Sequence, residues 1–207
     1  MRREELTELH FITSCENLPT LLQHGIQSHR RAAVGRRKGL VNPVSVAMSE
    51  VQDIREGVLV PGGRELHEYA NLYFCARNPM MFKLKERHLE LCVLRIDCAV
   101  LDIAKAVVTD MNAAKSICRF APASTGLLHI NREMVFAEDW RRPGDLIAYA
   151  RHKAIKCAEA LIPDQVLPIH IMGAYVSCAE AAARVNTIAP ALFTMIDSHL
   201  FFYEASL

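Results

Sequence analysis

Short runs of apolar residues, several of them alternating with polar ones, recur along the chain in the pattern typical of half-buried β-strands. The clearest runs are 9–13, 70–75, 89–96, 107–109 and 168–176. Helical segments fall between them without regular strand-helix-strand alternation, which predicts an α+β protein and not a doubly wound parallel sheet. No linker, internal repeat or low-complexity tract divides the 207 residues, so a single domain over 1–207 is expected.

Another run, 156–162, centres on Glu159 and predicts a strand. Ile155, Cys157 and Leu161 share the period-2 face of Glu159. A carboxylate in such surroundings lowers stability unless it is paired, and is a better candidate for chemistry than one on a helix surface. The alternative is an edge-strand or helix-terminal glutamate that faces water, and the local sequence alone favours that alternative.

Capping and breaking residues predict the helices. Ser14 is expected to cap a helix that Gly25 ends, and a short helix from Ser49 is expected to end at Gly57. The segment 145–153 is predicted to be helical and to lead into the strand of Glu159. Residues 120–130 lack periodicity and contain Pro, Ser, Thr and Gly, which predicts a flexible loop.

Charge is balanced overall but clustered locally. The net charge is +1 and the pI about 7.7, so bulk electrostatics does not indicate a nucleic-acid-binding protein. One segment between Ser28 and Leu40 is strongly basic and contains two glycines, which predicts a loop that is either solvated or in contact with phosphates. Its basic residues are Arg30, Arg31, Arg36, Arg37 and Lys38.

Cysteine usage and the N-terminus indicate the compartment. The seven cysteines form no C-x-x-C pair and several lie in apolar runs, which favours reduced thiols in a cytoplasmic protein over disulfides or a zinc site. The charged N-terminus is not followed by an apolar signal-type core, and no apolar run approaches the roughly 18 residues of a membrane span. A soluble protein that is not exported and does not bind a membrane is therefore expected.

Several common catalytic signatures are absent, including the P-loop, G-x-G-x-x-G after a strand, H-E-x-x-H and G-x-S-x-G. What remains is a set of separate polar residues, each placed at the end or inside of an apolar strand. Taken singly, His10 is more often a structural histidine and Arg55 a surface residue. The set comprises His10, Arg55, Tyr73, Asp110, Asn112, Arg119 and Glu159.

Five blocks, in this order, make the chain resemble the DarT-type ADP-ribosyltransferase toxins, which use NAD+ to modify bases in DNA. Weaker similarities lie at 108–114, at Arg119-Phe120 and at Asp139-Trp140. The blocks are 9–13 with Asn17-Leu18, 51–55, 61–63 with 66–69, 72–81 and 156–162. The block Tyr73-Phe74-x-x-Arg77-x-Pro79-Met80 is the most specific of them.

The resemblance implies a fold of the ADP-ribosyltransferase superfamily, with two small sheets around an NAD+ cleft and helices outside. NAD+ would be the substrate, and no metal ion is implied. His10, Thr13 and Asn17 match a first-strand block that holds NAD+, and Tyr73 and Arg77 match a block that lines its pocket. Arg55 matches an arginine that contacts NAD+ and is proposed to help deprotonate the target base. Glu159 matches the catalytic glutamate.

The residue types suit the chemistry that the resemblance implies. Cleavage between nicotinamide and ribose develops oxocarbenium character on the sugar, and an ionised Glu159 would favour that charge. Because arginine is nearly always protonated, Arg55 is assigned to stabilising the pyrophosphate or a base oxygen before literal proton abstraction. The basic segment, together with Asn112 and Arg119, is expected to lie along the cofactor or the nucleic-acid strand.

The resulting prediction is a mono-ADP-ribosyltransferase that moves ADP-ribose from NAD+ onto a base in DNA and acts as a toxin. Single-stranded DNA is the easier acceptor, since a base in a duplex must first be extruded. An antitoxin that removes the modification is the expected partner. Three alternatives remain open: an RNA or protein acceptor, a catalytically silent module that binds NAD+ or nucleic acid, and an α+β protein whose polar strand residues only satisfy one another.

Overall fold

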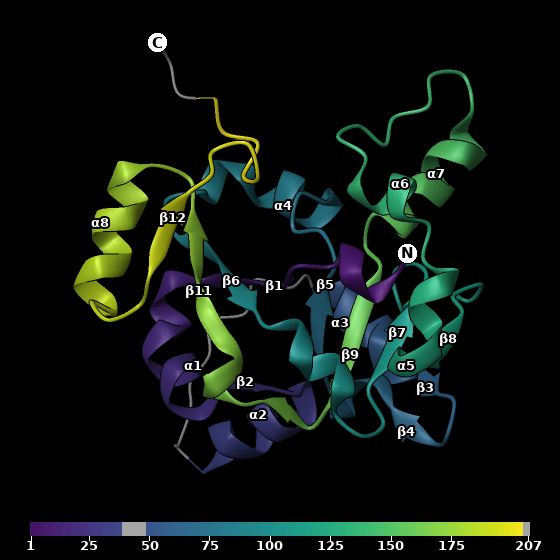
Figure 1. The fold of residues 1–207 in the computed structure, drawn as a ribbon, viewed down its shortest axis with the longest axis horizontal. Helices are drawn as coiled ribbons and strands as arrows, with labels where there is room; N and C mark the ends of the chain where they lie inside the picture. The colour runs from purple at the N-terminus through teal and green to yellow at the C-terminus, as the bar shows by residue number, and fades with distance from the viewer. Residues whose placement is uncertain (39–48, 205–207) are drawn as a thin grey trace.

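The computed structural model describes residues 1–38 and 49–204, whose strands form one eight-stranded sheet and two small ribbons (Figure 1). The order in the large sheet is β12-β11-β6-β1-β5-β9-β7-β8. Within it β11 and β12 are parallel, and the other neighbours are antiparallel. The strands are β1 (Leu9–Ser14), β5 (Tyr69–Tyr73), β6 (Leu91–Ile96), β7 (Val107–Thr109), β8 (Phe120–Pro122), β9 (Glu159–Pro163), β11 (Ile171–Val176) and β12 (Thr194–Ile196), with the ribbons β2 (Ile26–Gln27) on β10 (Gln165–Val166) and β3 (Leu59–Val60) on β4 (Arg64–Glu65).

Helices lie around the sheet, and α8 covers the β11 and β12 side while α6 and α7 lie beyond the opposite end (Figure 1). The α-helices are α1 (Leu18–His24), α2 (His29–Arg37), α3 (Ser49–Glu56), α4 (Pro79–Leu84), α5 (Ala123–Gly126), α6 (Arg132–Phe136), α7 (Leu146–Ile155) and α8 (Ala179–Ile188). Short 3₁₀ turns occupy Arg3–Glu5, Cys15–Asn17, Leu66–Glu68, Lys85–Arg87, Cys98–Asp102, Leu127–His129 and Pro168–His170. None of the helices in the described residues is long and apolar enough to cross a bilayer.

The predicted α+β class is confirmed, and the two small sheets expected from the resemblance are joined into one. The halves β12-β11-β6-β1 and β5-β9-β7-β8 contain four strands each. They meet between β1 and β5, where a single pair, His10 with Tyr73, is in register. By contrast, β1 pairs with β6 along six residues. The continuous sheet is therefore two small sheets linked at one point.

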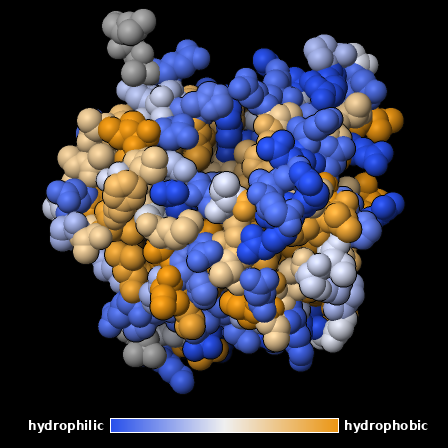
Figure 2. Space-filling view, viewed as in Figure 1, coloured by the Kyte–Doolittle hydropathy of each residue, from blue (hydrophilic) through white to orange (hydrophobic). Residues whose placement is uncertain are grey.

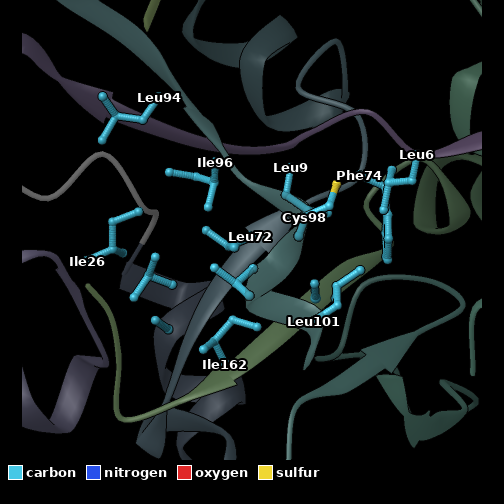
Figure 3. Packing of buried hydrophobic residues seen from close by; sticks show 14 of the residues in the cluster. Leu6, Leu9, Ile26, Leu72, Phe74, Leu94, Ile96, Cys98, Leu101 and Ile162 are labelled. Atoms are coloured by element: carbon cyan, nitrogen blue, oxygen red, sulfur yellow. The ribbon is translucent and has the colours of Figure 1, made fainter. Parts of the chain in front are cut away.

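Alternation along each strand separates the two faces of the sheet. Leu9, Leu72, Leu94 and Ile162 belong to the main core on the first face, and their side chains pack together in Figure 3. The intervening positions point to the second face, where two smaller apolar clusters form around Ile12, Val93 and Phe201 and around Val60, Tyr69 and Leu161. His10, Tyr73, Arg95 and Glu159 lie on this second face, whereas Thr13 lies on the first.

Three predictions about local structure are wrong. The basic segment was predicted to be a loop, but it forms the helix α2, which Ser28 caps by accepting a hydrogen bond from the Arg31 amide. Gly39 and Leu40, at the end of the predicted segment, lie outside the described residues. Residues 120–130 contain β8, α5 and a 3₁₀ turn in place of a flexible loop. The strand of Glu159 begins at Glu159, since α7 extends to Ile155 and Lys156 caps its end.

Gly25 ends α1 as predicted, and its substitution should be costly. Its φ is +76°, and a Cβ there would lie 2.1 Å from the Val166 carbonyl oxygen on β10. Gly25→Ala is expected to lower the free energy of unfolding by about 1–3 kcal/mol, measured by urea denaturation. Gly57→Ala is the matched control, because a Cβ at Gly57 meets nothing within 4 Å; equal stability of the two variants would contradict the argument.

Candidate active site

A row of polar side chains crosses the second face of the sheet at the junction of its halves. Tyr73 is the register partner of both His10 on β1 and Glu159 on β9. His10 is in turn opposite Arg95 on β6. Directly opposite residues of antiparallel strands point to the same face, so Arg95, His10, Tyr73 and Glu159 form one line. The register thus places the predicted site residues His10 and Glu159 on the same face of the sheet.

Arg55 reaches this row from α3 and forms a bidentate ion pair with Glu159. Its Nη1 donates to Oε1 at 3.0 Å and its Nη2 to Oε2 at 2.9 Å. Glu159 is fully buried and Arg55 is 5% exposed. Burial opposes the charged guanidinium, but the attraction and hydrogen bonds of Glu159 prevail and raise the pKa of Arg55. The pair therefore holds two opposite charges away from water.

Contacts from the neighbouring strand β7 and from the loop that follows it hold Glu159 in place. The amide of Ala113 donates to Oε1 at 3.1 Å, which gives the carboxylate a third donor. The hydroxyl of Thr109, at the end of β7, accepts from the Glu159 amide at 3.0 Å and donates to its carbonyl at 3.3 Å. These contacts fix the first residue of β9 at the point where the strand leaves α7.

Thr109→Val should disturb this arrangement without changing the shape of the side chain. The buried amide of Glu159 would lose its acceptor, and an unsatisfied buried donor costs about 1–3 kcal/mol. Urea denaturation should show a loss of stability in that range. Thr187→Val is the matched control, because its hydroxyl bonds the Ala183 carbonyl on the exposed surface of α8. A Thr109→Val protein as stable as this control would show that the contact contributes nothing.

Tyr73 and Cys157 lie in the field of the buried carboxylate. Burial, and then the charge of Glu159, raise the pKa of the Tyr73 hydroxyl. That hydroxyl donates to the Met80 sulfur at 3.2 Å. The same two causes raise the pKa of the Cys157 thiol to about 12. Both groups therefore stay protonated at neutral pH.

His10 is held by the carboxylate of Glu8, which lies directly before β1. Its Nε2 lies 3.2 Å from Oε1 of Glu8, and its Nδ1 is buried without a hydrogen-bond partner among the residues described. Thr13 and Asn17 lie elsewhere: Thr13 pairs in register with Cys92 of the main core and accepts from the Asn17 side chain at 3.0 Å. These two residues shape the connection from β1 to α1 and do not join the row.

The other predicted residues are spread around the row. The Arg77 guanidinium lies 3.8 Å from the Phe202 ring centroid and bonds the His199 carbonyl, so it contacts the C-terminal segment. Arg30 forms ion pairs with Glu65 and Glu68. The remaining basic side chains of this segment, Arg31, Arg36, Arg37 and Lys38, are exposed.

The predicted residues Asn112 and Arg119 flank the loop that carries Ala113. The Asn112 side chain accepts from the Ala114 amide at 2.9 Å and so shapes the turn that aims the Ala113 amide at Glu159. Arg119 is exposed, and its amide is bonded to Asp110. Among the described residues no group of three His, Cys, Asp or Glu side chains could hold a metal ion, and the expectation of a metal-free reaction stays a prediction.

Three groups that hold Glu159 or His10 in place were not identified from the sequence. Thr109 and the Ala113 amide lie in a segment that the sequence marked only as a weak similarity, and nothing local reveals that they bond Glu159. Glu8 was detectable, since it lies two residues before His10 and so shares its face.

The fold and the row place this chain among proteins with an ADP-ribosyltransferase-like α+β fold. The Thermosipho africanus DarTG structure, in complex with ADP-ribose, superposes with a TM-score of 0.81 at 27% identity and covers 95% of this chain and 51% of that one. The Thermus sp. 2.9 DarT structure, in complex with ADP-ribosylated ssDNA, gives 0.78 at 22% identity, covering 95% and 97%.

Comparison of the sequence with known families shows which family the chain belongs to. The family profile described as "ssDNA thymidine ADP-ribosyltransferase, DarT" matches residues 10–200, so the chain belongs to the DarT family. A DNA ADP-ribosyl transferase-DNA ADP-ribosyl glycohydrolase fusion protein of Thermosipho africanus (strain H17ap60334) is 30% identical over 185 residues, 86% of this chain and 45% of the relative. A DNA ADP-ribosyl transferase of Thermus sp. (strain 2.9) is 27% identical over 154 residues, 69% and 70% of the two chains. The chain thus spans about half the length of the fusion protein.

Proposed function

We propose that this protein transfers ADP-ribose from NAD+ to a thymidine base of single-stranded DNA and releases nicotinamide. The observation that carries the proposal is the buried Arg55–Glu159 pair on the row of His10 and Tyr73, in a chain of the DarT family. The relatives support the substrates: Thermus sp. 2.9 DarT was solved with NAD+ and with ADP-ribosylated ssDNA.

The residues of the row fit NAD+ as a substrate. His10 offers a buried Nδ1 that no described residue satisfies, as expected of a group that bonds a ligand. Tyr73, between His10 and Glu159, presents a neutral aromatic ring. Glu159 supplies an ionised carboxylate with three donors fixed on it. This set matches a ligand that has sugar hydroxyls and an aromatic ring.

Glu159 and Arg55 would divide the chemical work. NAD+ supplies a leaving group that is already cationic, so departure of nicotinamide needs no strong acid. Glu159 then stabilises the positive charge that develops on the ribose. Arg55 would stabilise the pyrophosphate or an oxygen of the base, because a guanidinium paired with a carboxylate is a poor proton acceptor.

The ion pair between Arg55 and Glu159 must open before Glu159 can contact the ribose of NAD+. Glu159 is fully buried and each of its oxygens accepts from Arg55, so a ribose can reach the carboxylate only after the groups that cover it move, and Arg55 is the side chain in direct contact with both oxygens. Arg55 is therefore proposed to exchange its carboxylate partner for the phosphates or base of the substrates. A resting enzyme with a covered carboxylate would also be protected from transferring ADP-ribose to water.

The biological role is proposed from the family. The DarT family implies a toxin, and the glycohydrolase half of the Thermosipho africanus fusion protein supports an antitoxin that removes the modification. The predicted nucleic-acid contacts of Arg31, Arg36, Arg37 and Lys38 are supported by the exposure of these side chains on α2 and at its C-terminal cap. Arg30, tied to Glu65 and Glu68, is the member of this group least available to phosphates.

The experiment that tests the proposal is mass spectrometry of defined oligonucleotides incubated with NAD+. Single-stranded DNA with one thymidine should gain one ADP-ribose, with fragmentation placing it on that base. The same oligonucleotide with the thymidine replaced by cytidine is the control and should gain nothing. Labelling of RNA or of the protein itself, with the DNA unchanged, would support the alternative acceptors.

A further inference from the structure

Glu8 connects three side chains of the sheet to the histidine of the row. It lies just before β1, and its side chain is 10% exposed. Oε1 is 3.2 Å from the His10 Nε2 and accepts from the Tyr175 hydroxyl at 2.7 Å. Oε2 accepts from the Arg95 Nε at 2.7 Å. The donors come from β1, β6 and β11, so the carboxylate links three adjacent strands on the face of the row.

The three donors keep Glu8 ionised. Burial alone would favour the neutral acid, but the hydrogen bonds from His10, Tyr175 and Arg95 outweigh it and lower the pKa of Glu8 to about 2. A permanent negative charge beside His10 has a definite consequence. Glu8 can only accept, so the nitrogen of His10 that faces it must carry a proton.

The proton on Nε2 determines what the other nitrogen of His10 does. In the neutral ring a proton on Nε2 leaves Nδ1 as an acceptor, and the structure describes no donor that satisfies Nδ1. Hydroxyl and amide donors are abundant on the ribose and carboxamide of NAD+. The orientation of His10 therefore matters for a ligand, and Glu8 is the group that sets it.

We propose that Glu8 is a positioning residue for NAD+: it accepts a hydrogen bond from Nε2 of His10 and thereby holds the ring so that Nδ1, an acceptor when the ring is neutral, is left for the dinucleotide. This inference rests on the proposed function and deepens it, because it extends the NAD+ site beyond the residues of the family resemblance. Arg95, at the β6 end of the row, and Tyr175 on β11 donate to the same carboxylate. Tyr175 lies with its ring 6.3 Å from that of His10.

Glu8→Gln should break the arrangement although the two side chains have nearly the same shape. Three donors surround the two oxygens of Glu8, and the amide of glutamine has one oxygen and two N–H groups. If that oxygen stays on His10 and Tyr175, the amide nitrogen faces the Arg95 Nε, donor against donor. If the side chain is flipped, His10 loses its acceptor and its ring is free to turn.

The test measures NAD+ binding directly, by isothermal titration calorimetry, together with steady-state transfer to DNA. Glu8→Gln is expected to raise the Kd for NAD+ about tenfold or more, which corresponds to about 1.4 kcal/mol. KM for NAD+ should rise with it while kcat changes less, as expected when ground-state binding is lost. Tyr175→Phe, which removes one donor, should give a smaller rise. Glu90→Gln, in an exposed pair with Arg87, is the control.

A double-mutant cycle distinguishes positioning from a general structural role. If Glu8 acts through His10, then Glu8→Gln should add little to the loss caused by His10→Gln, whereas independent roles would add. Additive losses, or a Glu8→Gln protein that binds NAD+ as tightly as the wild type, would overturn the inference while leaving the transferase proposal intact. A wild-type protein that shows no NAD+ binding and no DNA labelling would overturn both.

Discussion

Glu159→Gln is expected to reduce transfer of ADP-ribose to single-stranded DNA by at least about 10²- to 10³-fold, the range found when one electrostatic contact to a transition state is removed. The amide keeps the shape of the carboxylate but cannot stabilise positive charge on the ribose. Initial rates with labelled NAD+ measure the effect. Growth inhibition on expression should fall in parallel.

Two controls separate lost catalysis from lost folding. Circular dichroism and thermal denaturation must show that the Glu159→Gln protein is folded at the assay temperature, since the variant also removes the charge that faces Arg55. Glu90→Gln changes a carboxylate that is paired with Arg87 and lies away from the row, and should leave the rate unchanged. A folded Glu159→Gln protein with wild-type activity would exclude Glu159 from the chemistry.

The second large effect concerns the stability of the buried ion pair. Arg55→Met leaves the Glu159 carboxylate buried with the Ala113 amide, and Glu159→Leu leaves a guanidinium buried without a counter-charge. Each single variant is expected to lose about 3–5 kcal/mol of unfolding free energy, because an uncompensated buried charge is strongly destabilising. The double variant should recover most of that loss, since an apolar pair has no charge to desolvate.

Urea denaturation of the four proteins forms the cycle for this pair. The coupling between the two substitutions should be large and favourable to the double variant. All three variants should be inactive in DNA labelling, so the stable double variant would separate activity from folding. Losses that simply add would show that the two charges do not depend on each other.

The faces of the strands were predictable from the sequence, but their alignment was not. Alternation through 9–13 places His10 opposite to Leu9, and the structure has that arrangement. Which residue of a strand lies beside His10 depends on pairing between segments more than 60 residues apart, and periodicity carries no such information. The match of whole blocks to a known family placed His10, Tyr73 and Glu159 together where local pattern could not.

Errors in the local predictions have identifiable causes. Gly35 and the density of arginines suggested a loop, yet the Ser28 cap was enough to start α2. Near Glu159, the residues from Ile155 to Ala158 alternate as a strand would, but the helix that Asp145 caps continues to Ile155 and ends at Lys156, so Cys157 and Ala158 only connect it to β9. Arg55 resembled a surface residue because α3 is mostly polar, and its burial depends on one carboxylate 104 residues away.

Figure 2 gives the surroundings of these features, with apolar side chains reaching the surface on the side of α8, β11 and β12 and hydrophilic ones dominating around α6 and α7. Apolar residues exposed near β11 and β12 include Met172, Phe193 and Ile196. The reactive row lies inside the molecule and contributes little to this surface, since Glu159 is fully buried.

The one-residue junction between β1 and β5 has a mechanical consequence. A sheet resists splaying through its ladder of hydrogen bonds, and here the ladder is reduced to a single rung at His10 and Tyr73. The seam contains one register pair, against two between β7 and β9 and three or more between the other neighbouring strands, so its separation breaks the fewest pairs in the sheet. Because His10 and Glu159 lie on opposite sides of it, a small opening of the seam widens the gap between them while each half stays rigid.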